Sequence, residues 1–385
     1  MSGDASAGMK IAVVRQRYNP YGGAERFVER ALGALVREGA EVTLITRSWE
    51  GAEVRDGYRQ ILCDPPARGR VARDRSFAQC VQAVLRDGGF DITQSHERIP
   101  GCMIFRAGDG VHASWLDKLR RVRGPLGRLG LALNPYHRYI LAAEREMFAD
   151  PALRAVICNS RMVRDEIACY YGVAEDKLRV IYNGVDLDVF HPKLAELHRS
   201  AVRERHGIPE AVPLLLFVGN GFERKGVPQL LRAFATMRNE SARLAIVGGD
   251  KKLQRMKALA AQLGIAKRVL FAGAQQDVKP WYGAADAFVL PTLYDPCPNA
   301  ALEALACGLP SISSTACGAA EWLTPGVNGQ LVESTDVPAL SVALDALCAL
   351  GQSPAAHLAA RAAVAHLSLG AMSQQLIALY RELLS

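Results

Sequence analysis

The stretch Leu214-Leu-Leu-Phe-Val-Gly-Asn-Gly-Phe-Glu-Arg-Lys-Gly-Val227 places an apolar run directly before a glycine-containing loop and a helix start. The apolar run, Leu214–Val218, is expected to form a buried β-strand. After the loop Gly219–Gly226, Pro228 stands in the first turn of the expected helix, where proline is tolerated. A strand that leads through a short loop into a helix is the repeating unit of a parallel α/β sheet.

The same alternation runs through both halves of the chain. A helix is expected over Ala24–Arg37, and two more over Pro354–His366 and Leu369–Leu384. Nine further strands are expected: Lys10–Val14, Glu41–Thr46, Ile92–Gln94, Met103–Phe105, Ala155–Cys158, Leu244–Val247, Val269–Phe271, Ala287–Leu290 and Ser311–Ser313. The pattern predicts two doubly wound α/β domains with parallel sheets and a cleft between them.

The turn signal Asn183-Gly184 ends the first series of strands and marks the expected hinge. The predicted domains therefore cover residues 9–183 and 184–368. No apolar run reaches the roughly 18 residues that cross a bilayer. The segment Met1–Gly8 lacks the pattern of a secretory signal. We therefore expect a cytoplasmic protein.

The net charge of +7 is unevenly distributed over the 385 residues. Residues 1–183 hold 28 Lys and Arg against 22 Asp and Glu, a difference of +6, whereas residues 184–385 hold 18 against 17, a difference of +1. The basic excess of the first half indicates an anionic partner, which could be nucleic acid, a membrane surface or a phosphorylated substrate.

The 9 cysteines form no CxxC pair, and their number is odd. In a cytoplasmic chain such thiols are expected to stay reduced and to serve as small buried side chains.

The loop Gly219–Gly226 contains the residue types that bind phosphate. Glycines let the backbone approach a ligand, and the following helix offers free N–H groups and a positive dipole. Arg224 and Lys225 add two cations, which would stabilise the charge that develops on a departing diphosphate. The glycine spacing matches neither GxGxxG nor GxxxxGK[ST], so a solvated turn is the alternative.

A second loop, Pro291–Asn299, precedes an expected helix over Ala300–Cys307. Asn299 is a favourable N-cap residue, so the N–H groups of Ala300 and Ala301 would point at a ligand.

Two acids flank this helix start, Asp295 in the loop and Glu303 about one turn inside the helix. The first could accept hydrogen bonds from sugar hydroxyls, and the second from a ribose diol. A capped helix with incidental acids is the alternative interpretation.

At Asp295-Pro-Cys-Pro-Asn-Ala-Ala-Leu-Glu303 the sequence resembles the E-x7-E pattern of glycosyltransferase family 4, the retaining transferases of GT-B fold. The first acid is Asp instead of Glu, and its shorter side chain changes the reach toward a sugar. The family's basic pair matches Arg224-Lys225, its Gly-Gly loop matches Gly22-Gly23, and its Asn-Gly-Val-Asp motif matches residues 183–186. The match spans nearly the whole chain in the correct order.

Within the family the sequence looks most like the lipopolysaccharide core glucosyltransferase I group. The stretches that carry this likeness are Tyr18-Asn-Pro-Tyr-Gly-Gly23, Arg47-Ser-Trp-Glu-Gly51 and Phe222-Glu-Arg-Lys-Gly-Val227. The likeness implies transfer of glucose from UDP-glucose to a heptose of the inner core.

The resemblance implies two facing Rossmann-like domains, with the last helix, about residues 369–385, crossing back to the N-terminal domain. It also places the nucleotide sugar on the C-terminal domain, with no metal and no other cofactor. Glu303 should hold the ribose, Arg224 and Lys225 the diphosphate, and Asp295 the sugar. The full set of residues expected to bind the nucleotide sugar is Gly22, Gly23, Arg224, Lys225, Phe271, Ala274, Asp295, Asn299, Ala300, Ala301 and Glu303.

Two imidazoles follow expected strands of the first half, where open α/β sheets bind ligands. They are His96, after the strand 92–94, and His112, after the strand 103–105. We favour His112, with Asp109, as contacts of the sugar or acceptor. These two join Arg224, Lys225 and Asp295 as the residues expected to act in catalysis. The resemblance requires no protein nucleophile, because a phosphate oxygen is thought to take the acceptor's proton.

The segment Trp115–Arg128 combines apolar and basic side chains, with five cations and one acid between Asp117 and Arg128. Trp115, Leu116, Leu119 and Leu126 are its apolar members. Such segments lie on anionic lipid, which predicts a peripheral position on the inner face of the inner membrane near a lipid-linked glycan acceptor. A solvated basic helix is the alternative, and Gly124-Pro125 should interrupt any single helix.

The sequence leaves two other functions open and disfavours a third. The chain could use UDP-galactose, UDP-N-acetylglucosamine or GDP-mannose as donor. It could be a UDP-N-acetylglucosamine 2-epimerase, which would form product without an acceptor. A nucleic-acid binder is disfavoured because the basic segment lacks interleaved stacking aromatics beyond Trp115.

Overall fold

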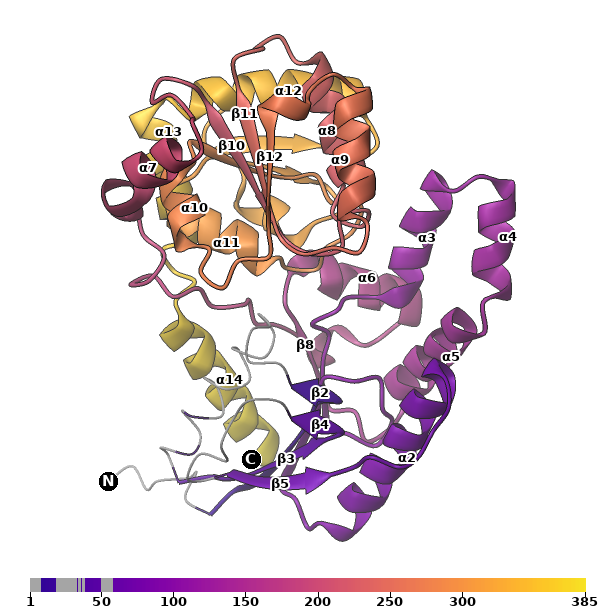
Figure 1. Ribbon diagram of the computed structural model, residues 1–385. Coiled ribbons are helices and arrows are strands. Elements are labelled where there is room, and N and C mark those ends of the chain that lie inside the picture. The colour runs from indigo at the N-terminus through magenta and orange to yellow at the C-terminus, as the bar shows by residue number, and fades with distance from the viewer. Residues whose placement is uncertain (1–7, 19–32, 34–35, 37–38, 50–57) are drawn as a thin grey trace. The chain divides into compact units, whose positions relative to one another are not determined.

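A computed structural model of the chain describes residues 8–18, 33, 36, 39–49 and 58–385 (Figure 1). The described chain divides into two compact units. Unit 1 runs up to Gly184 and includes Leu369–Ser385, and unit 2 comprises Val185–Ser368.

Unit 1 contains a parallel sheet of seven strands in its described part. Their order across the sheet is β5 (Tyr58–Leu62), β3 (Glu41–Thr46), β1 (Lys10–Val14), β6 (Ile92–Ser95), β7 (Ile104–Arg106), β8 (Ala155–Cys158) and β9 (Leu178–Val180). Two short strands, β2 (Arg17–Tyr18) and β4 (Ser48–Trp49), pair beside it. The five strands expected here are confirmed within one residue at each end.

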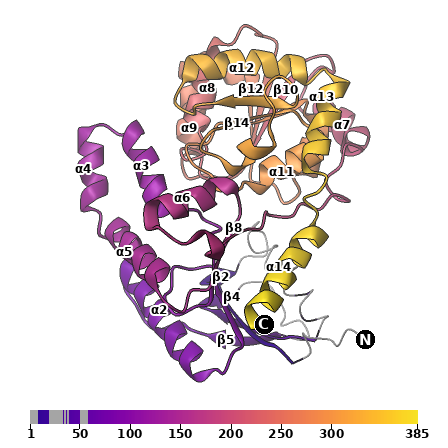
Figure 2. The same cartoon turned by 180° about the vertical axis from the view of Figure 1, so that it is seen from behind.

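Six helices are described in unit 1: α2 (Arg70–Asp87), α3 (His112–Val122), α4 (Pro125–Leu133), α5 (Pro135–Ala149), α6 (Arg161–Tyr171) and α14 (Leu369–Leu384). The expected helix over 24–37 lies mostly outside the described residues. Helix α14, expected with the same bounds, returns to unit 1 from the end of the chain (Figure 2). It packs Leu376 and Tyr380 into the apolar cluster that holds Ile11 and Ile92, which closes one face of the sheet.

Unit 2 repeats the plan with a six-stranded parallel sheet. The strand order is β12 (Val269–Gly273), β11 (Arg243–Val247), β10 (Leu214–Val218), β13 (Ala287–Leu290), β14 (Ser311–Ser314) and β15 (Gly329–Val332). Its helices are α7 (Leu194–Arg205), α8 (Val227–Thr236), α9 (Leu253–Gln262), α10 (Lys279–Ala284), α11 (Asn299–Ala306), α12 (Val337–Leu350) and α13 (Pro354–Val364). Two parallel sheets of this kind, each in its own unit, confirm the predicted α/β, Rossmann-like class.

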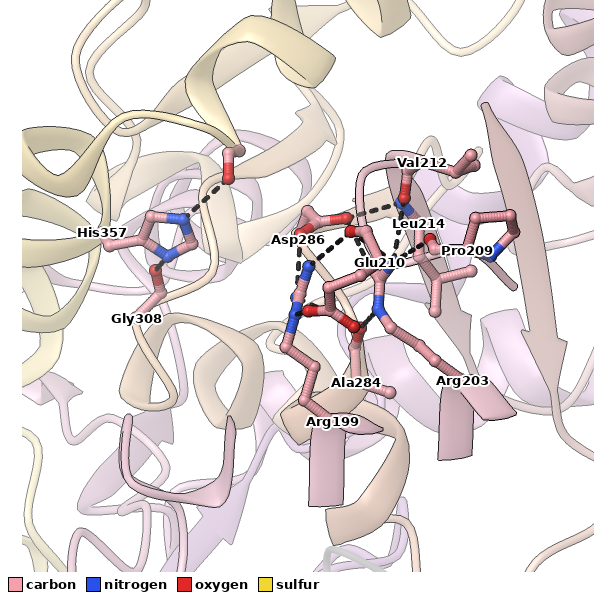
Figure 3. Close-up of polar contacts among 11 residues, drawn as sticks. Arg199, Arg203, Pro209, Glu210, Val212, Leu214, Ala284, Asp286, Gly308 and His357 are labelled. Atoms are coloured by element: carbon pink, nitrogen blue, oxygen red, sulfur yellow. Dashed lines mark hydrogen bonds and ion pairs between the residues drawn. The ribbon is translucent and has the colours of Figure 1, made fainter. Parts of the chain in front are cut away.

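Buried Asp286 fixes the N-terminal ends of the two central strands of unit 2 (Figure 3). Its Oδ2 accepts from the backbone N–H of Leu214, 2.7 Å away, and from Arg203 Nη2, also at 2.7 Å. Arg199 Nη1 lies 2.9 Å from Oδ1. Both arginines belong to α7, so this carboxylate ties a helix to the strands β10 and β13. The loops at the C-terminal ends of β10 and β13 therefore extend from strands that are held firmly in place.

Cys63 and Cys80 form a disulfide, so the expectation that all nine thiols are reduced is wrong for this pair. Cys63 follows β5, and Cys80 lies on α2. The pair meets because α2 packs on that end of the sheet, in the cluster of Phe77 and Val81. The other seven cysteines are free, and six of them are buried as expected.

The described residues include no single helix that is long and apolar enough to cross a membrane. Helices α12 and α13 together have the length and apolar composition of a membrane-spanning segment, but the chain bends by 103° between them.

Candidate active site

Two loops of unit 2 are locked together at the C-terminal ends of the neighbouring strands β10 and β13. The carbonyl oxygen of Arg224 accepts from the N–H of Leu293 at 2.8 Å and from the hydroxyl of Thr292 at 3.0 Å. Gly226 has a φ of 78°, and a Cβ there would lie 1.9 Å from the Pro291 carbonyl oxygen. Only glycine allows this approach, so the loops 219–226 and 291–298 form one rigid surface.

Lys225 and Asp295 meet on this surface. The Lys225 Nζ lies 3.0 Å from Asp295 Oδ2, and Arg224 Nη2 lies 3.8 Å from the same oxygen. A Cβ on Gly219 would lie 2.7 Å from the Lys225 Cδ, so this glycine leaves room for the lysine side chain. The structure thus brings together both predicted cations and the predicted sugar-binding acid.

The start of α11 differs in detail from the prediction. The N-cap is Pro298 rather than Asn299, and its side chain makes no cap hydrogen bond. The ring of Pro298 fixes its φ at −72°, so the helix begins at Asn299 itself. The N–H of Ala301 donates to the Pro298 carbonyl at 3.0 Å. This bond occupies the N–H of Ala301, one of the two groups that the sequence predicts to point at a ligand, whereas the N–H of Ala300 precedes it at the helix start.

Glu303 lies one turn into α11 and is buried. The Tyr282 hydroxyl donates to its Oε2 at 2.9 Å and lies 3.2 Å from the Ala300 carbonyl oxygen. Tyr282, from α10, thereby holds the carboxylate near the helix start. The motifs of the sequence did not point to this tyrosine.

The sequence predicts a strand that ends at Phe271, with Phe271 and Ala274 flanking the base, and the strand is two residues longer than predicted. Strand β12 continues to Gly273, because Val247 of β11 pairs with Gly273 across a register shift. Only Ala274, which is exposed, follows the strand.

Two of the predicted residues of unit 1, Asp109 and His112, lie at the start of α3. Buried Glu144, from α5, accepts from the backbone N–H of His112 at 2.8 Å and from Arg98 Nε at 2.8 Å. The Arg98 Nη2 donates to the Gly110 carbonyl at 3.2 Å. Arg98 and Glu144 thus clamp the loop that carries Asp109, whose side chain is exposed. Gly22 and Gly23 lie outside the described residues.

His112 forms a pair with His137 of α5, with 3.1 Å between Nε2 and Nδ1. Burial, together with the nearby charge of Arg98, lowers the pKa of His112 to about 4. A neutral imidazole with one nitrogen engaged by His137 can offer its other nitrogen to a hydroxyl group. Sequence spacing did not connect these two histidines, which are 25 residues apart.

His96, the other candidate, is buried beneath the C-terminal edge of the sheet. Its Nε2 lies 3.1 Å from Gln94 Nε2, and the Tyr380 hydroxyl of α14 donates to Gln94 Oε1 at 2.7 Å. Because an amide nitrogen only donates, His96 Nε2 accepts and its Nδ1 carries the proton. Burial, then the charges of Arg106 and Arg15, lower the pKa of His96 well below its ordinary value.

These two histidines predict that acid destabilises the fold. Both have a pKa in the folded state below the ordinary 6.5, so the unfolded chain binds more protons as the pH falls past that value. The free energy of unfolding should be largest above about pH 6.5 and decline toward about pH 5. The midpoint of urea unfolding, measured at several pH values in this range, gives the slope of the free energy of unfolding against pH. His96→Gln should flatten it, whereas His366→Asn, at an exposed position, should not. A midpoint that rises on acidification in the wild type would contradict the assignment.

Family models match both units. The model for Glycosyl transferases group 1 matches residues 198–363, and that for Glycosyltransferase Family 4 matches residues 21–189. A D-inositol 3-phosphate glycosyltransferase from Xylanimonas cellulosilytica is 30% identical over 85% of this chain and 84% of its own length. The chain belongs to glycosyltransferase family 4.

This transferase is also similar to the lipopolysaccharide glucosyltransferase WaaG of Escherichia coli K12, at 26% identity over 84% of this chain and 85% of the relative. A crystal structure of WaaG superposes with a TM-score of 0.78 at 25% identity and covers 97% of this chain and 98% of its own. A structure of HepE from Anabaena in complex with UDP-glucose shares the fold, with a TM-score of 0.72 at 18% identity over 97% of this chain and all of its own. The fold of this transferase is therefore GT-B.

Proposed function

We propose that this family 4 transferase moves glucose from UDP-glucose onto a heptose of the lipopolysaccharide core, or onto a similar lipid-linked glycan. The observation that carries the proposal is the meeting of Lys225, Arg224 and Asp295 on two locked loops beside the start of α11. The similarity to WaaG supports the choice of sugar and acceptor.

The donor would lie along this surface of unit 2. Glu303, oriented by Tyr282, would accept hydrogen bonds from the ribose diol. Lys225 and Arg224 would neutralise the diphosphate, and the N–H groups at the start of α11 would bind its distal phosphate. Asp295 would accept from sugar hydroxyls, and Phe271 and Ala274 would flank the base.

Lys225 is a suitable group to stabilise the leaving diphosphate without a metal. Its side chain is only 11% exposed, so its charge acts through a medium less polar than water. A cation already in place costs no reorganisation when negative charge develops on the departing oxygen. We propose that transfer proceeds with retention and that a phosphate oxygen takes the acceptor's proton, so no protein nucleophile is needed.

The acceptor would be held by unit 1, with Asp109 and His112 as contacts. His112 is neutral at physiological pH because its pKa is lowered to about 4 by burial. It would therefore take part in hydrogen bonds to hydroxyl groups rather than in ion pairs.

A thermal unfolding screen across nucleotide sugars tests the donor. A ligand at a hundred times its dissociation constant should add about 2.7 kcal/mol to the free energy of unfolding. We expect UDP and UDP-glucose to stabilise the protein and GDP-mannose to leave it unchanged. Stabilisation by GDP-mannose alone would contradict the proposed donor.

A family 4 transferase with a different donor or acceptor is the second candidate. The aspartate at position 295, where the family pattern has glutamate, favours it because a shorter side chain reaches a different part of the sugar. The relative from Xylanimonas cellulosilytica is named for D-inositol 3-phosphate and not for a lipopolysaccharide. Radiolabelled UDP-galactose and UDP-N-acetylglucosamine would distinguish the donors.

Helices α3 and α4 project from unit 1 as a hairpin (Figure 1). Helix α4 has no buried residue, and Leu126, Leu129 and Leu133 are 86%, 56% and 67% exposed. A break separates the helices at Arg123-Gly124, one residue before the expected Gly124-Pro125, and four arginines lie near it: Arg120, Arg121, Arg123 and Arg128. Leu116, expected to face lipid, is instead buried, because it points from α3 into unit 1.

An exposed apolar helix flanked by cations is typical of segments that lie on anionic lipid. We therefore propose that the protein is cytoplasmic and binds the inner face of the inner membrane through this hairpin. This position would bring a lipid-linked acceptor to unit 1.

Replacement of Arg120, Arg121 and Arg123 by glutamine should weaken binding to anionic vesicles by roughly a hundredfold, since each cation near the surface contributes about 1 kcal/mol. A flotation assay measures the effect. Activity on a soluble acceptor fragment should persist. Replacement of three exposed lysines of unit 2, Lys251, Lys257 and Lys267, is the matched control for charge. Equal vesicle binding by both triple variants would disprove a role of the hairpin.

A further inference from the structure

The carboxylate of Asp295 engages the same two cations that the diphosphate would need. Its Oδ2 accepts from Lys225 Nζ at 3.0 Å and lies 3.8 Å from Arg224 Nη2. The side chains of Asp295 and Lys225 are 8% and 11% exposed, so solvent screens their attraction only weakly. A carboxylate in this place is an internal competitor of any anion that binds Lys225.

Both partners are fixed by their backbones. The N–H of Asp295 donates to the Ala316 carbonyl at 3.1 Å, and the N–H of Gly318 donates to the Asp295 carbonyl at 2.9 Å. The N–H of Lys225 donates to the Gly221 carbonyl at 3.0 Å. These hydrogen bonds hold the main chain at position 295 in place, so we expect its carboxylate to stay near the bound phosphates.

Whether the carboxylate of Asp295 strengthens or weakens binding of a ligand depends on whether the ligand carries a sugar. A nucleoside diphosphate alone sets negative phosphates beside a negative carboxylate, and this repulsion opposes binding. A nucleotide sugar adds hydroxyl groups, which can donate hydrogen bonds to the same carboxylate. These bonds to a charged acceptor are stronger than neutral ones and offset the repulsion.

We propose that Asp295 discriminates between donor and product: it stabilises the bound nucleotide sugar and destabilises the bound nucleoside diphosphate, so that the latter leaves after transfer. The inference rests on the proposed function, since it assumes that Lys225 and Arg224 bind the diphosphate. Transfer removes the sugar from the site. The carboxylate of Asp295 then faces the phosphates without the hydrogen bonds that the sugar hydroxyls donated.

Titration calorimetry with UDP and with UDP-glucose tests the inference. Asp295→Asn keeps the shape and an oxygen acceptor for Lys225 but removes the charge. It should bind UDP about tenfold more tightly than the wild type, through loss of the like-charge repulsion. It should bind UDP-glucose no more tightly than the wild type, and UDP should become a correspondingly stronger product inhibitor.

Two variants serve as controls. Asp295→Glu keeps the charge and should not gain affinity for UDP. Glu240→Gln removes an exposed acid of the same unit and should leave both affinities unchanged. Asp295→Ser, which also removes the charge, provides the same comparison if the asparagine variant does not fold.

The outcomes separate the two proposals. UDP that binds the wild type and both charge-free variants with equal affinity would overturn the inference and leave the proposed function standing. Tighter binding of UDP and UDP-glucose by the same factor would also overturn it, because Asp295 would then not discriminate. Failure of the wild type to bind UDP at all would overturn the proposed function and the inference with it.

Discussion

Lys225→Ala is expected to reduce the rate of sugar transfer by a factor of about 10² to 10³. The ammonium group is the most buried cation on the two locked loops. In the proposed position of the donor, it lies where negative charge would develop on the leaving diphosphate. Removal of one preorganised charge-stabilising group from an active site typically costs a factor of about 10² to 10³ in kcat. Initial rates with a radiolabelled donor and a soluble acceptor fragment measure the loss.

A measurement of stability and a control variant show whether the loss of activity in Lys225→Ala comes from the missing charge. Asp295 loses its closest partner in the variant, so thermal unfolding must show that the fold persists. Lys252→Ala is the matched control, because Lys252 is an exposed lysine that pairs with Glu223 of the same loop. The control should keep its rate within a factor of about 3, as expected of an exposed substitution. Full activity of Lys225→Ala would contradict the phosphate assignment.

Glu303→Gln is expected to reduce kcat/KM for the donor by about 10- to 100-fold, in the range for loss of a charged hydrogen-bond acceptor. The carboxylate is buried one turn into α11 and is held by Tyr282, so it can accept from both hydroxyls of a ribose at little entropic cost. The amide keeps the shape but loses the charge and one acceptor.

A 2′-deoxy nucleotide identifies the group that Glu303 contacts. If Glu303 binds the ribose diol, the wild type should bind 2′-deoxy-UDP more weakly than UDP, and Glu303→Gln should show a much smaller difference. Tyr282→Phe should have an intermediate effect, because it loses only the orienting hydrogen bond. If Glu303→Gln and the loss of the 2′-hydroxyl each weaken binding by an amount that does not depend on the other, Glu303 does not contact the ribose.

Much of the sheet structure follows from local apolar runs. The strands β10 and β13, and β1 after Lys10, are continuous runs of buried apolar residues, which is what a parallel sheet covered on both faces requires. The edge strands β5, β9 and β15 were not predicted, because they are short or carry polar residues among the apolar ones. Edge strands contact fewer neighbours, so their sequences show a weaker pattern.

The residues that we propose to bind phosphate could be found in the sequence because they lie in two short segments next to strands. The groups that orient these residues could not be found, since they come from distant positions. Tyr282 reaches Glu303 from another helix, and Glu144 reaches the His112 backbone from α5, 32 residues away. Sequence patterns indicate faces and loop ends, but not which buried polar side chains will meet.

The helix start at Asn299 shows a second limit. Asparagine is a favoured N-cap, and the prediction used that preference. The preceding proline already supplies the extended conformation that an N-cap needs, with φ −72° and ψ 115°. The chain therefore enters the helix one residue earlier. The first N–H groups of the helix shift by the same amount, from Ala300 and Ala301 to Asn299 and Ala300.

A crystal structure of the protein with UDP, in a buffer that contains EDTA, would show whether unit 2 binds the diphosphate without a metal. We expect the distal phosphate within hydrogen-bond distance of Lys225 Nζ and of the N–H groups at the start of α11, with the ribose on Glu303 and no metal bound. A crystal in which this surface of unit 2 holds no nucleotide, or in which UDP binds only after magnesium or manganese is restored, would contradict this expectation.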